Sequence, residues 1–588
     1  MHPATSVPVV AAIVVPLAGA VAGAEPDLSP AISVIETVPI DVPGGPLSLP
    51  PSQPFVGAFG GQPRIDNDGN WYGLFRFPVS NPSDPFEYTR DNAYFRNGEP
   101  WSREGYQLPN SQSFVPVADF PVSQQAYSDV SIGSGGAVAQ VIRGVFDVPT
   151  VADGTPNAAL YDFETTDFPR FDAAVVDNEV LLVEGDLVPP MSELFDFGDG
   201  PVPLFRISSV YPASYQGGPT ELVALASFSF DDNTFAPEFD AAFRVTDPGT
   251  PQQAATLLFT SEPGNPLPGL HGIELSTYSR GEEGLAYRGD GSFVFTGDIR
   301  GEPFDTDDAL FVYNRGTDSV QLLIQAGDPS PIPGADYFGL LNNPVAFNDQ
   351  GDWAIRADTT ADFATDQIIV VNGQQVIRED DIVGTAAPGP LQLDAAIANI
   401  ELDREGNVIW YGPWSVDGLC DDISDSGFGI FEGIFFNDRL LIEAGVTSFT
   451  DVQIGDTLFP ELVVKDLPNT EFGGFTVSPE GDRLITFALL AEPSDEICDF
   501  SINVDRPVAQ VLLEIDLAQV RAILDADVPC PGDTDGDLTV GLDDLLTVLA
   551  NFGDAVGGGP SDGDLDGSGT VGLEDLLVVL SNFGSVCG

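Results

Sequence analysis

The sequence predicts a mainly β protein in which about seven repeated units form a β-propeller, followed by a small all-α domain near the C-terminus. Three observations lead to this prediction. The 588 residues are 43% hydrophobic and include 63 Gly and 50 Pro, which favours many tight turns around a large buried core. A turn motif containing Gly recurs through residues 55–525, and an acidic motif occurs twice within residues 530–588.

Charge and histidine content exclude several functions. The chain has 91 Asp and Glu against 21 Lys and Arg, a formal net charge of −70, so it repels phosphate backbones and anionic membranes. It contains only two histidines, His2 and His271. A Ser-His-Asp triad or a multi-histidine metal site would therefore depend wholly on His271. Carboxylate and calcium chemistry remain available to the chain.

Residues 1–24 are expected to form a signal peptide. The stretch Val9–Val21 is apolar, and Ala22-Gly23-Ala24 supplies a small-x-small cleavage pattern. The usual positively charged start is missing, so an apolar N-terminal tail is the alternative. No later stretch reaches about 18 apolar residues, and we expect no membrane span. Residues 25–54 are assigned to an N-terminal extension, and the protein is expected to be secreted or held at the cell surface.

The turn motif consists of an apolar residue, an Asn- or Asp-rich turn with Gly, and an alternating β-type run. Its glycines are expected at positions 69, 135, 217, 291, 351, 406 and 481, a mean spacing of about 69 residues. The clearest copies are residues 65–72, 347–355 and 402–410, and weaker copies are 287–295 and 477–485. The turn residues and the tryptophans that follow them are expected to be structural.

A second pattern follows each turn: a hydrophobic strand, a tight Asn or Gly turn, and another strand that often ends in Gly-Asp. It occupies residues 174–186, 311–328, 368–380 and 434–445. Each unit thus offers at least four short strands, as in one propeller blade. Tandem β-sandwich modules and a β-helix are the alternatives, because the spacing of the units is irregular.

The units resemble the tandem Asn-x-x-Gly-x-Trp/Phe-Ala repeats of exported bacterial proteins that carry interchangeable C-terminal anchors. The copy at Phe347–Ile355 fits this pattern best. The resemblance implies export and attachment but no particular activity.

The acidic motif is a duplicated calcium-type loop followed by a leucine-rich helix. The loops cover residues 533–544 and 564–575, 31 residues apart. Oxygen ligands at positions 1, 3, 5 and 12, with a backbone carbonyl at position 7, form the EF-hand pattern that suits Ca²⁺. Downstream, Leu545, Leu546, Leu549 and Phe552 recur as Leu576, Leu577, Leu580 and Phe583, which predicts one apolar face on each helix.

Residues 530–588 resemble a type I dockerin, whose two loop-helix repeats fold around two calcium ions and bind a cohesin partner. The resemblance implies two ligand sets: Asp533, Asp535, Asp537, Thr539 and Asp544; and Asp564, Asp566, Ser568, Thr570 and Asp575. Leu538 replaces the usual turn glycine of the first loop. Leu542-Asp543 and Leu573-Glu574 replace the hydroxyl pairs that cohesin normally contacts, so the partner is expected to be cohesin-like or another surface protein.

Four cysteines, an even number, suggest two disulfides in an exported protein. Chain order and domain context favour Cys420–Cys498 and Cys530–Cys587, although three pairings are possible and free buried thiols are the alternative.

Two functions fit these features. The first is a non-catalytic scaffold or binding protein, in which the propeller holds a polysaccharide or protein ligand and the C-terminal domain mediates attachment. The alternative is a secreted carbohydrate-active hydrolase or lyase that carries a dockerin, with two carboxylates at the centre of the propeller. The absence of a nucleophile motif and the near-absence of histidine favour the first function, and no catalytic residue can be named among the 91 acids.

Overall fold

The computed structural model divides the chain into two compact units. Residues 31–518 form one unit, and residues 1–30 together with 519–588 form the other. The structure describes residues 28–38, 62–76, 92–104, 107–111, 114–116, 127–128, 130–133, 135–146, 171–183, 204–214, 221–229, 239–250, 252–279, 284–304, 306–341, 343–362, 365–383, 389–391, 399–414, 431–454, 457–467, 474–493, 509–527, 532, 534, 540–553, 563–565 and 570–583. The expected signal peptide, residues 1–24, and all four cysteines lie outside these residues.

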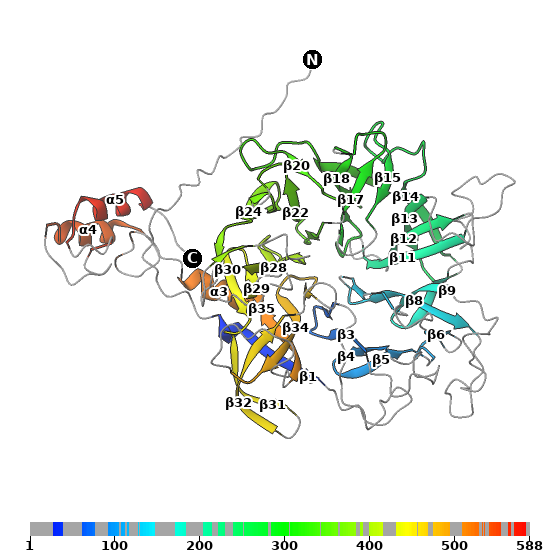
Figure 1. Cartoon of the computed structure of the whole chain (residues 1–588), viewed down its shortest axis with the longest axis horizontal. Coiled ribbons are helices and arrows are strands. Elements are labelled where there is room, and N and C mark those ends of the chain that lie inside the picture. Colours follow the sequence, from blue (N-terminus) through cyan, green and yellow to red (C-terminus); the bar gives the residue numbers. More distant parts are fainter. Residues whose placement is uncertain are drawn as a thin grey trace, which may run out of the picture. The chain divides into compact units, whose positions relative to one another are not determined.

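The larger unit is a seven-bladed β-propeller, as the sequence predicts, with its blades in chain order around one axis (Figure 1). Each blade is an antiparallel sheet. Blade 1 contains β2 (Arg64–Ile65), β3 (Trp71–Arg76), β4 (Asn92–Arg96) and β5 (Glu99–Arg103). Blade 2 contains β6 (Phe114–Pro116), β7 (Ser131–Ile132), β8 (Val138–Phe146), β9 (Phe171–Val176) and β10 (Glu179–Val183). Blade 3 contains β11 (Leu204–Ala213), β12 (Glu221–Ser229), β13 (Phe239–Thr246) and β14 (Ala254–Thr260).

Blades 4 to 6 follow the same plan. Blade 4 contains β15 (Leu275–Tyr278), β16 (Leu285–Tyr287), β17 (Phe293–Ile299), β18 (Asp308–Asn314) and β19 (Ser319–Gln325). Blade 5 contains β20 (Tyr337–Phe338), β21 (Val345–Phe347), β22 (Trp353–Thr359), β23 (Ile368–Val371) and β24 (Gln374–Arg378). Blade 6 contains β27 (Ile400–Leu402), β28 (Val408–Trp414), β29 (Phe431–Phe436) and β30 (Arg439–Glu443), and β25 (Ile382–Val383) pairs with β26 (Gly389–Pro390) between blades 5 and 6.

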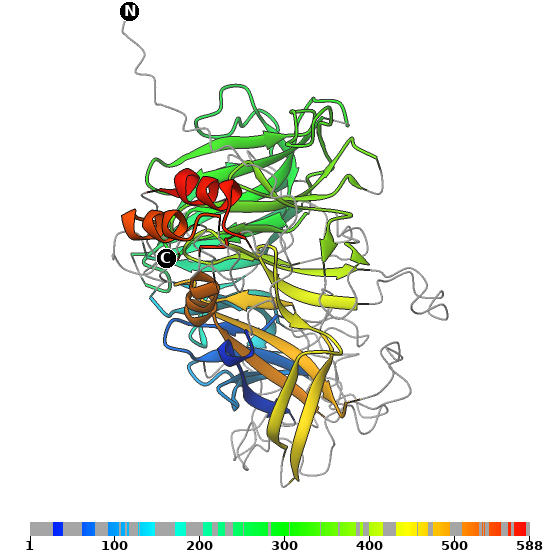
Figure 2. The ribbon, with the colours of Figure 1, turned by 90° about the vertical axis from the view of Figure 1, so that its left-hand side faces the viewer.

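Blade 7 closes the ring by joining the two ends of the propeller. It contains β31 (Ser448–Ile454), β32 (Thr457–Asp466), β33 (Phe475–Val477), β34 (Arg483–Ala491) and β35 (Ala509–Asp516), together with β1 (Ile32–Val38). β1 pairs antiparallel with β35, with Ile32 opposite Ile515. Residues 32–38 therefore belong to the propeller, although the sequence places its start near residue 55. The paired strands β31 and β32 extend from this blade (Figure 2).

Apolar clusters fill the spaces between neighbouring blades, because each sheet has side chains on both of its faces. One cluster joins blade 7 to blade 1, where Phe487 and Phe75 lie 5.8 Å apart between ring centroids. Another joins blades 5 and 6, where the fully buried Trp410 stacks on Phe435 at 4.2 Å. Further clusters join blades 1 and 2, 2 and 3, 3 and 4, and 4 and 5.

The predicted Gly turns lie between the innermost strand of a blade and the next strand. Gly69, Gly291, Gly351, Gly406 and Gly481 all have positive φ. In blade 2 the turn glycine is Gly136, at φ 78°, rather than the expected Gly135, because the N–H of Gly136 closes the turn on Gly133 O. The expected Gly217 lies outside the described residues.

The smaller unit contains α4 (Leu542–Ala550) and α5 (Leu573–Asn582), and most of α3 (Leu517–Asp527) also falls in it; a short 3₁₀ helix, η1, spans Ser29–Ala31. α4 and α5 pack around the buried side chains of Val540, Val548, Val571 and Val579. The described part of the chain contains no helix long and apolar enough to cross a membrane.

Candidate functional site

The two predicted calcium loops are related by an internal near-symmetry. A Cβ on Gly532 would come within 3.1 Å of Val579 Cα in α5, and a Cβ on Gly563 would come within 3.1 Å of Val548 Cα in α4. The two pairs of positions differ by 31 residues, the spacing of the sequence repeat. Each loop therefore begins with its backbone close against the helix of the other repeat, where only glycine fits.

The last acid of each loop is held in the same way in both repeats. Asp544 Oδ1 accepts the N–H of Thr534 at 2.6 Å, and its Oδ2 accepts the N–H of Gly541 at 2.6 Å. Asp575 accepts the corresponding N–H groups of Leu565 and Gly572, also at 2.6 Å. These bonds draw the twelfth loop position back beside the first, as a loop closed around a cation requires.

Three predicted ligands are buried carboxylates. Asp544, Asp564 and Asp575 are at most 1% exposed. Residues 530–588 contain eleven Asp and Glu but no Lys or Arg, so no side chain of this segment can neutralise them. Burying a carboxylate without an opposite charge costs several kcal/mol, on the order of the penalties known for unpaired buried ions. The donor set is therefore one that a hard cation fits.

The other predicted ligands are only partly described. The structure places Thr570 on an exposed bridge position before α5. The remaining ligands lie outside the described residues: Asp533, Asp535, Asp537, Thr539, Asp566 and Ser568. Among the described residues, no three Asp, Glu, Cys or His side chains converge as a metal site.

The described part of the propeller contains a cavity of about 120 Å³ on its axis, lined by residues of all seven blades. The innermost strands provide its wall: β2, β7, β11, β16, β21, β27 and β33. Sequence analysis does not identify these residues. A signal is present nonetheless, because the third residue of the turn motif lines the cavity in four successive blades, as Gly289, Asp349, Arg404 and Pro479.

The lining combines cationic, anionic and aromatic side chains. Arg64 Nη1 donates to Thr476 Oγ1 at 3.2 Å, which links blade 1 to blade 7. Tyr287 of blade 4 accepts the N–H of Ile132 of blade 2 at 2.9 Å. Its ring lies 4.2 Å from that of Tyr211, between centroids. The bond between Tyr287 and Ile132 thus crosses from blade 4 to blade 2, and polar groups placed in this way suit binding to a fixed set of polar groups.

Asp349 is a lining carboxyl whose pKa is shifted by its surroundings. Its pKa is raised chiefly because neighbouring protein atoms restrict its hydration, and the carboxylates of Asp290 and Glu480 raise it further. Arg288 and a backbone hydrogen bond to Gly289 act in the opposite direction. Glu401, a second acid, lies in the same lining. His271 is exposed on the segment before β15 and is not part of the lining.

No protein-family model and no curated protein sequence matches the chain. Solved structures with similar folds include the α-L-arabinanase of Penicillium chrysogenum, with a TM-score of 0.29, 10% identity, and coverage of 69% of this chain and 97% of the other. They also include an α-L-arabinofuranosidase of Fusarium graminearum, with a TM-score of 0.28, 10% identity, and coverage of 70% of this chain and 99% of the other. A third is the Trypanosoma rangeli sialidase, with a TM-score of 0.29, 7% identity, and coverage of 79% of this chain and 74% of the other. Because these TM-scores are below 0.5, the similarity carries no argument about function.

Proposed function

We propose that the chain is an exported binding protein, in which the propeller holds a polar ligand at its axial cavity and residues 530–588 form a dockerin-like calcium module for attachment. One observation carries the proposal: three buried carboxylates, Asp544, Asp564 and Asp575, lie in a duplicated loop-helix segment that has no basic residue. A cation held by the two loops would place positive charge beside these carboxylates.

Asp544 and Asp575 would hold one calcium ion each, as the last ligand of their loops. The backbone bonds to each carboxylate fix its position before the ion binds. Calcium then supplies the charge that lets the acidic loops lie close together, so that metal binding contributes directly to the folding of the module.

The axial cavity is proposed as a binding site rather than a reaction centre. Its guanidinium groups, from Arg64 and Arg404, can donate to ligand oxygens, and its tyrosine rings can pack against sugar or peptide faces. The ligand class is a polysaccharide or a protein segment with exposed hydroxyl or carboxylate groups.

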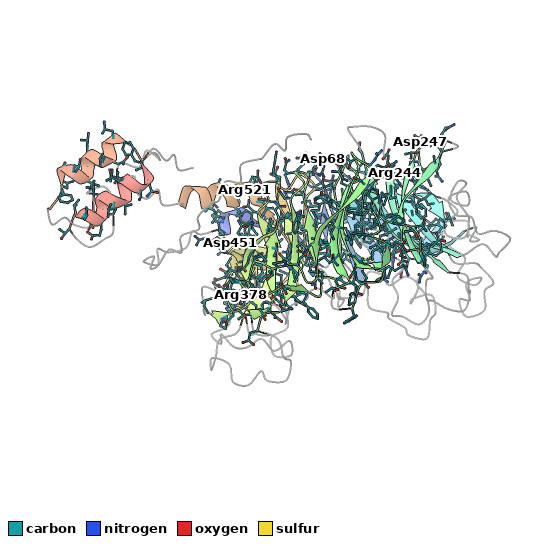
Figure 3. All side chains as sticks on the ribbon, turned by 90° about the horizontal axis from the view of Figure 1, so that it is seen from above. Asp68, Arg244, Asp247, Arg378, Asp451 and Arg521 are labelled. Carbon is teal, nitrogen blue, oxygen red and sulfur yellow. The ribbon has the colours of Figure 1, made fainter. Side chains whose placement is uncertain are left out.

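The test of the module is calorimetric titration of the full chain with calcium, using variants at the last ligands. We expect one fewer bound ion in Asp544→Ala and one fewer in Asp575→Ala, with two fewer in the double variant. Asp247→Ala, an exposed turn residue of blade 3 that Figure 3 labels, is the matched control and should leave the stoichiometry unchanged. Equal stoichiometry in the wild type, the two single variants and the double variant contradicts the proposed module.

A carbohydrate-active enzyme is the second candidate, and a specific observation favours it. Asp349 and Glu401 both line the cavity, and the pKa of Asp349 is raised, as a general acid requires. Loss of polysaccharide cleavage in both Asp349→Asn and Glu401→Gln, with ligand binding retained, would establish this function. Binding without any cleavage by the wild-type chain would support the non-catalytic one.

A further inference from the structure

The helices α4 and α5 expose an unusual amount of apolar surface. Thirteen large apolar side chains of the described residues are exposed, and eight of them belong to these helices and the residues that follow them. They are Leu542, Leu546, Leu549, Phe552, Leu573, Leu577, Leu580 and Phe583, each between 49% and 61% exposed. A short segment that exposes many large apolar side chains is commonly an interaction site.

The eight residues form two matching stripes, which we call the leucine stripes. Leu542, Leu546 and Leu549 are spaced by four and three positions, so they share one side of α4. Leu573, Leu577 and Leu580 repeat this arrangement on α5. Phe552 and Phe583 extend the stripes beyond the helices, again 31 residues apart.

The stripes are not the faces that hold the module together. That role belongs to Val548 and Val579, which are fully buried, while Leu545 and Leu576 pack partly against them. Leu545 lies three positions before Val548 and four before Leu549, so the buried valine and the exposed leucines share one apolar side of α4, as the sequence pattern indicates. Each helix therefore has a buried valine edge, and the leucine stripe beside it is about half exposed.

Charge decides which occupant fits the stripes. Residues 530–588 carry eleven acids and no base, so two copies of the module repel one another strongly. The rest of the chain is also highly acidic and repels the module in the same way. Glu574 is exposed directly beside Leu573 at the start of one stripe. A complementary surface is apolar at its centre and cationic at its border.

We propose that the leucine stripes dock a partner protein whose contact surface is apolar and bordered by lysine or arginine. The inference rests on the proposed role of the module in attachment and adds the chemistry of the partner. The apolar centre supplies the affinity, and the opposite charges at the border supply the orientation and speed the encounter.

The test uses the calcium-loaded full chain and two labelled amphipathic helical peptides with the same leucine pattern. One peptide carries lysine at every polar position and the other carries glutamate. We expect fluorescence anisotropy to show at least tenfold tighter binding of the lysine peptide. The double variant Leu546→Ser, Leu577→Ser should weaken that binding at least tenfold. Phe304→Ser, which changes a large apolar residue that is 86% exposed in the described part of the propeller, should not.

Three results would overturn the proposal. The lysine peptide could bind the double serine variant as well as the wild type, which would show that charge alone is responsible. The glutamate peptide could bind equally well. Sedimentation could also show a dimer that the leucine substitutions dissociate, which would make a second copy the occupant.

Two controls keep the result interpretable. Calcium titration of the double variant reports whether the module still folds, and Leu549→Ser with Leu580→Ser is a second pair that tests the same stripes. Leucine-dependent peptide binding in a chain that binds no calcium would contradict the proposed metal role and leave the docking surface supported. Calcium binding without leucine-dependent peptide binding would do the reverse.

Discussion

Asn97 ties together two turns of blade 1 through its side chain. Its Nδ2 donates to Asn70 Oδ1 at 2.7 Å, and its Oδ1 accepts the N–H of Trp71 at 2.9 Å. Asn372 with Asp352 in blade 5, and Asn437 with Asn407 in blade 6, repeat both bonds. The asparagines are at φ near 50°, a conformation that asparagine adopts more readily than most residues.

Replacing Asn97 should destabilise the first blade. Asn97→Ala loses both side-chain bonds and places alanine at positive φ, so we expect a loss of about 1–3 kcal/mol in the free energy of unfolding. Asn97→Gly keeps the backbone conformation and loses only the bonds, and it should lose less. Urea unfolding of the three proteins checks this order, and equal midpoints for all three would contradict it.

Two glycines at positive φ should respond differently to alanine. A Cβ on Gly481 would lie 2.3 Å from Arg404 N, in the backbone of the preceding blade, whereas a Cβ on Gly445 would meet open space. Both positions have a similar positive φ, 75° and 82°. We expect Gly445→Ala to cost about 1 kcal/mol of unfolding free energy from conformation alone, and Gly481→Ala to cost clearly more because blades 6 and 7 must separate. Thermal unfolding of the two variants measures the difference, which should vanish if the turn of blade 7 can move freely.

Stability should depend on pH through a carboxyl pair in blade 4. Asp298 and Asp308 lie opposite each other on β17 and β18, and burial, then the hydrogen bond to Asp308, raise the pKa of Asp298 to about 7. The folded chain therefore binds this proton more tightly than the unfolded chain, and stability falls as the pH rises from about 4 to about 7. Asp298→Asn keeps a donor for Asp308 without the charge.

The asparagine variant should consequently be more stable than the wild type at pH 8 and nearly equal to it at pH 4. At pH 8 we expect a difference of roughly 1–2 kcal/mol in the free energy of unfolding, which is less than the full pKa shift implies because water partly screens the side chain. Asp290→Asn, in the turn before β17, serves as the comparison for loss of an acid. Parallel stability curves for the wild type and Asp298→Asn between pH 4 and 8 would argue against a shared proton.

The near-symmetry of the C-terminal repeats gives a further prediction. Gly532→Val and Gly563→Val should weaken calcium binding to a similar extent, since each side chain would push a loop away from the helix of the other repeat. Gly553→Val, at a positive φ but with no atoms within reach of its Cβ, controls for backbone strain. Calorimetric affinities compare the three variants, and an effect confined to one loop would mean that the repeats are not equivalent.

The turn chemistry explains why the propeller was predictable. Asn348 Oδ1 accepts two backbone N–H groups of its own turn, and such local bonds leave a sequence pattern that can be read directly. The strand β1 left no such pattern. Its position is decided by pairing with β35 at the far end of the chain, and no local motif records a pairing at that distance.

The axial cavity was not predictable for a similar reason. Arg64 and Thr476 meet only because blades 1 and 7 become neighbours when the ring closes. The predicted calcium loops leave a local sequence pattern because their expected ligands lie within twelve residues of one another, and calcium binding stays a prediction. The exposure of the leucine stripes was not predictable, because helical spacing identifies an apolar side but does not tell whether another surface covers it.

The pairing of Ile32 with Ile515 also dictates when the protein can finish folding. During synthesis, β1 cannot pair with β35 until more than four hundred residues that follow β1 have been made. Blades 1 to 6 can form from local hairpins in the meantime, but the ring stays open and the flanks of blades 1 and 6 stay exposed. Closure of the ring is thus a late event that joins distant parts of the chain at a high entropic cost. The partly folded chain is most prone to aggregation immediately before this step.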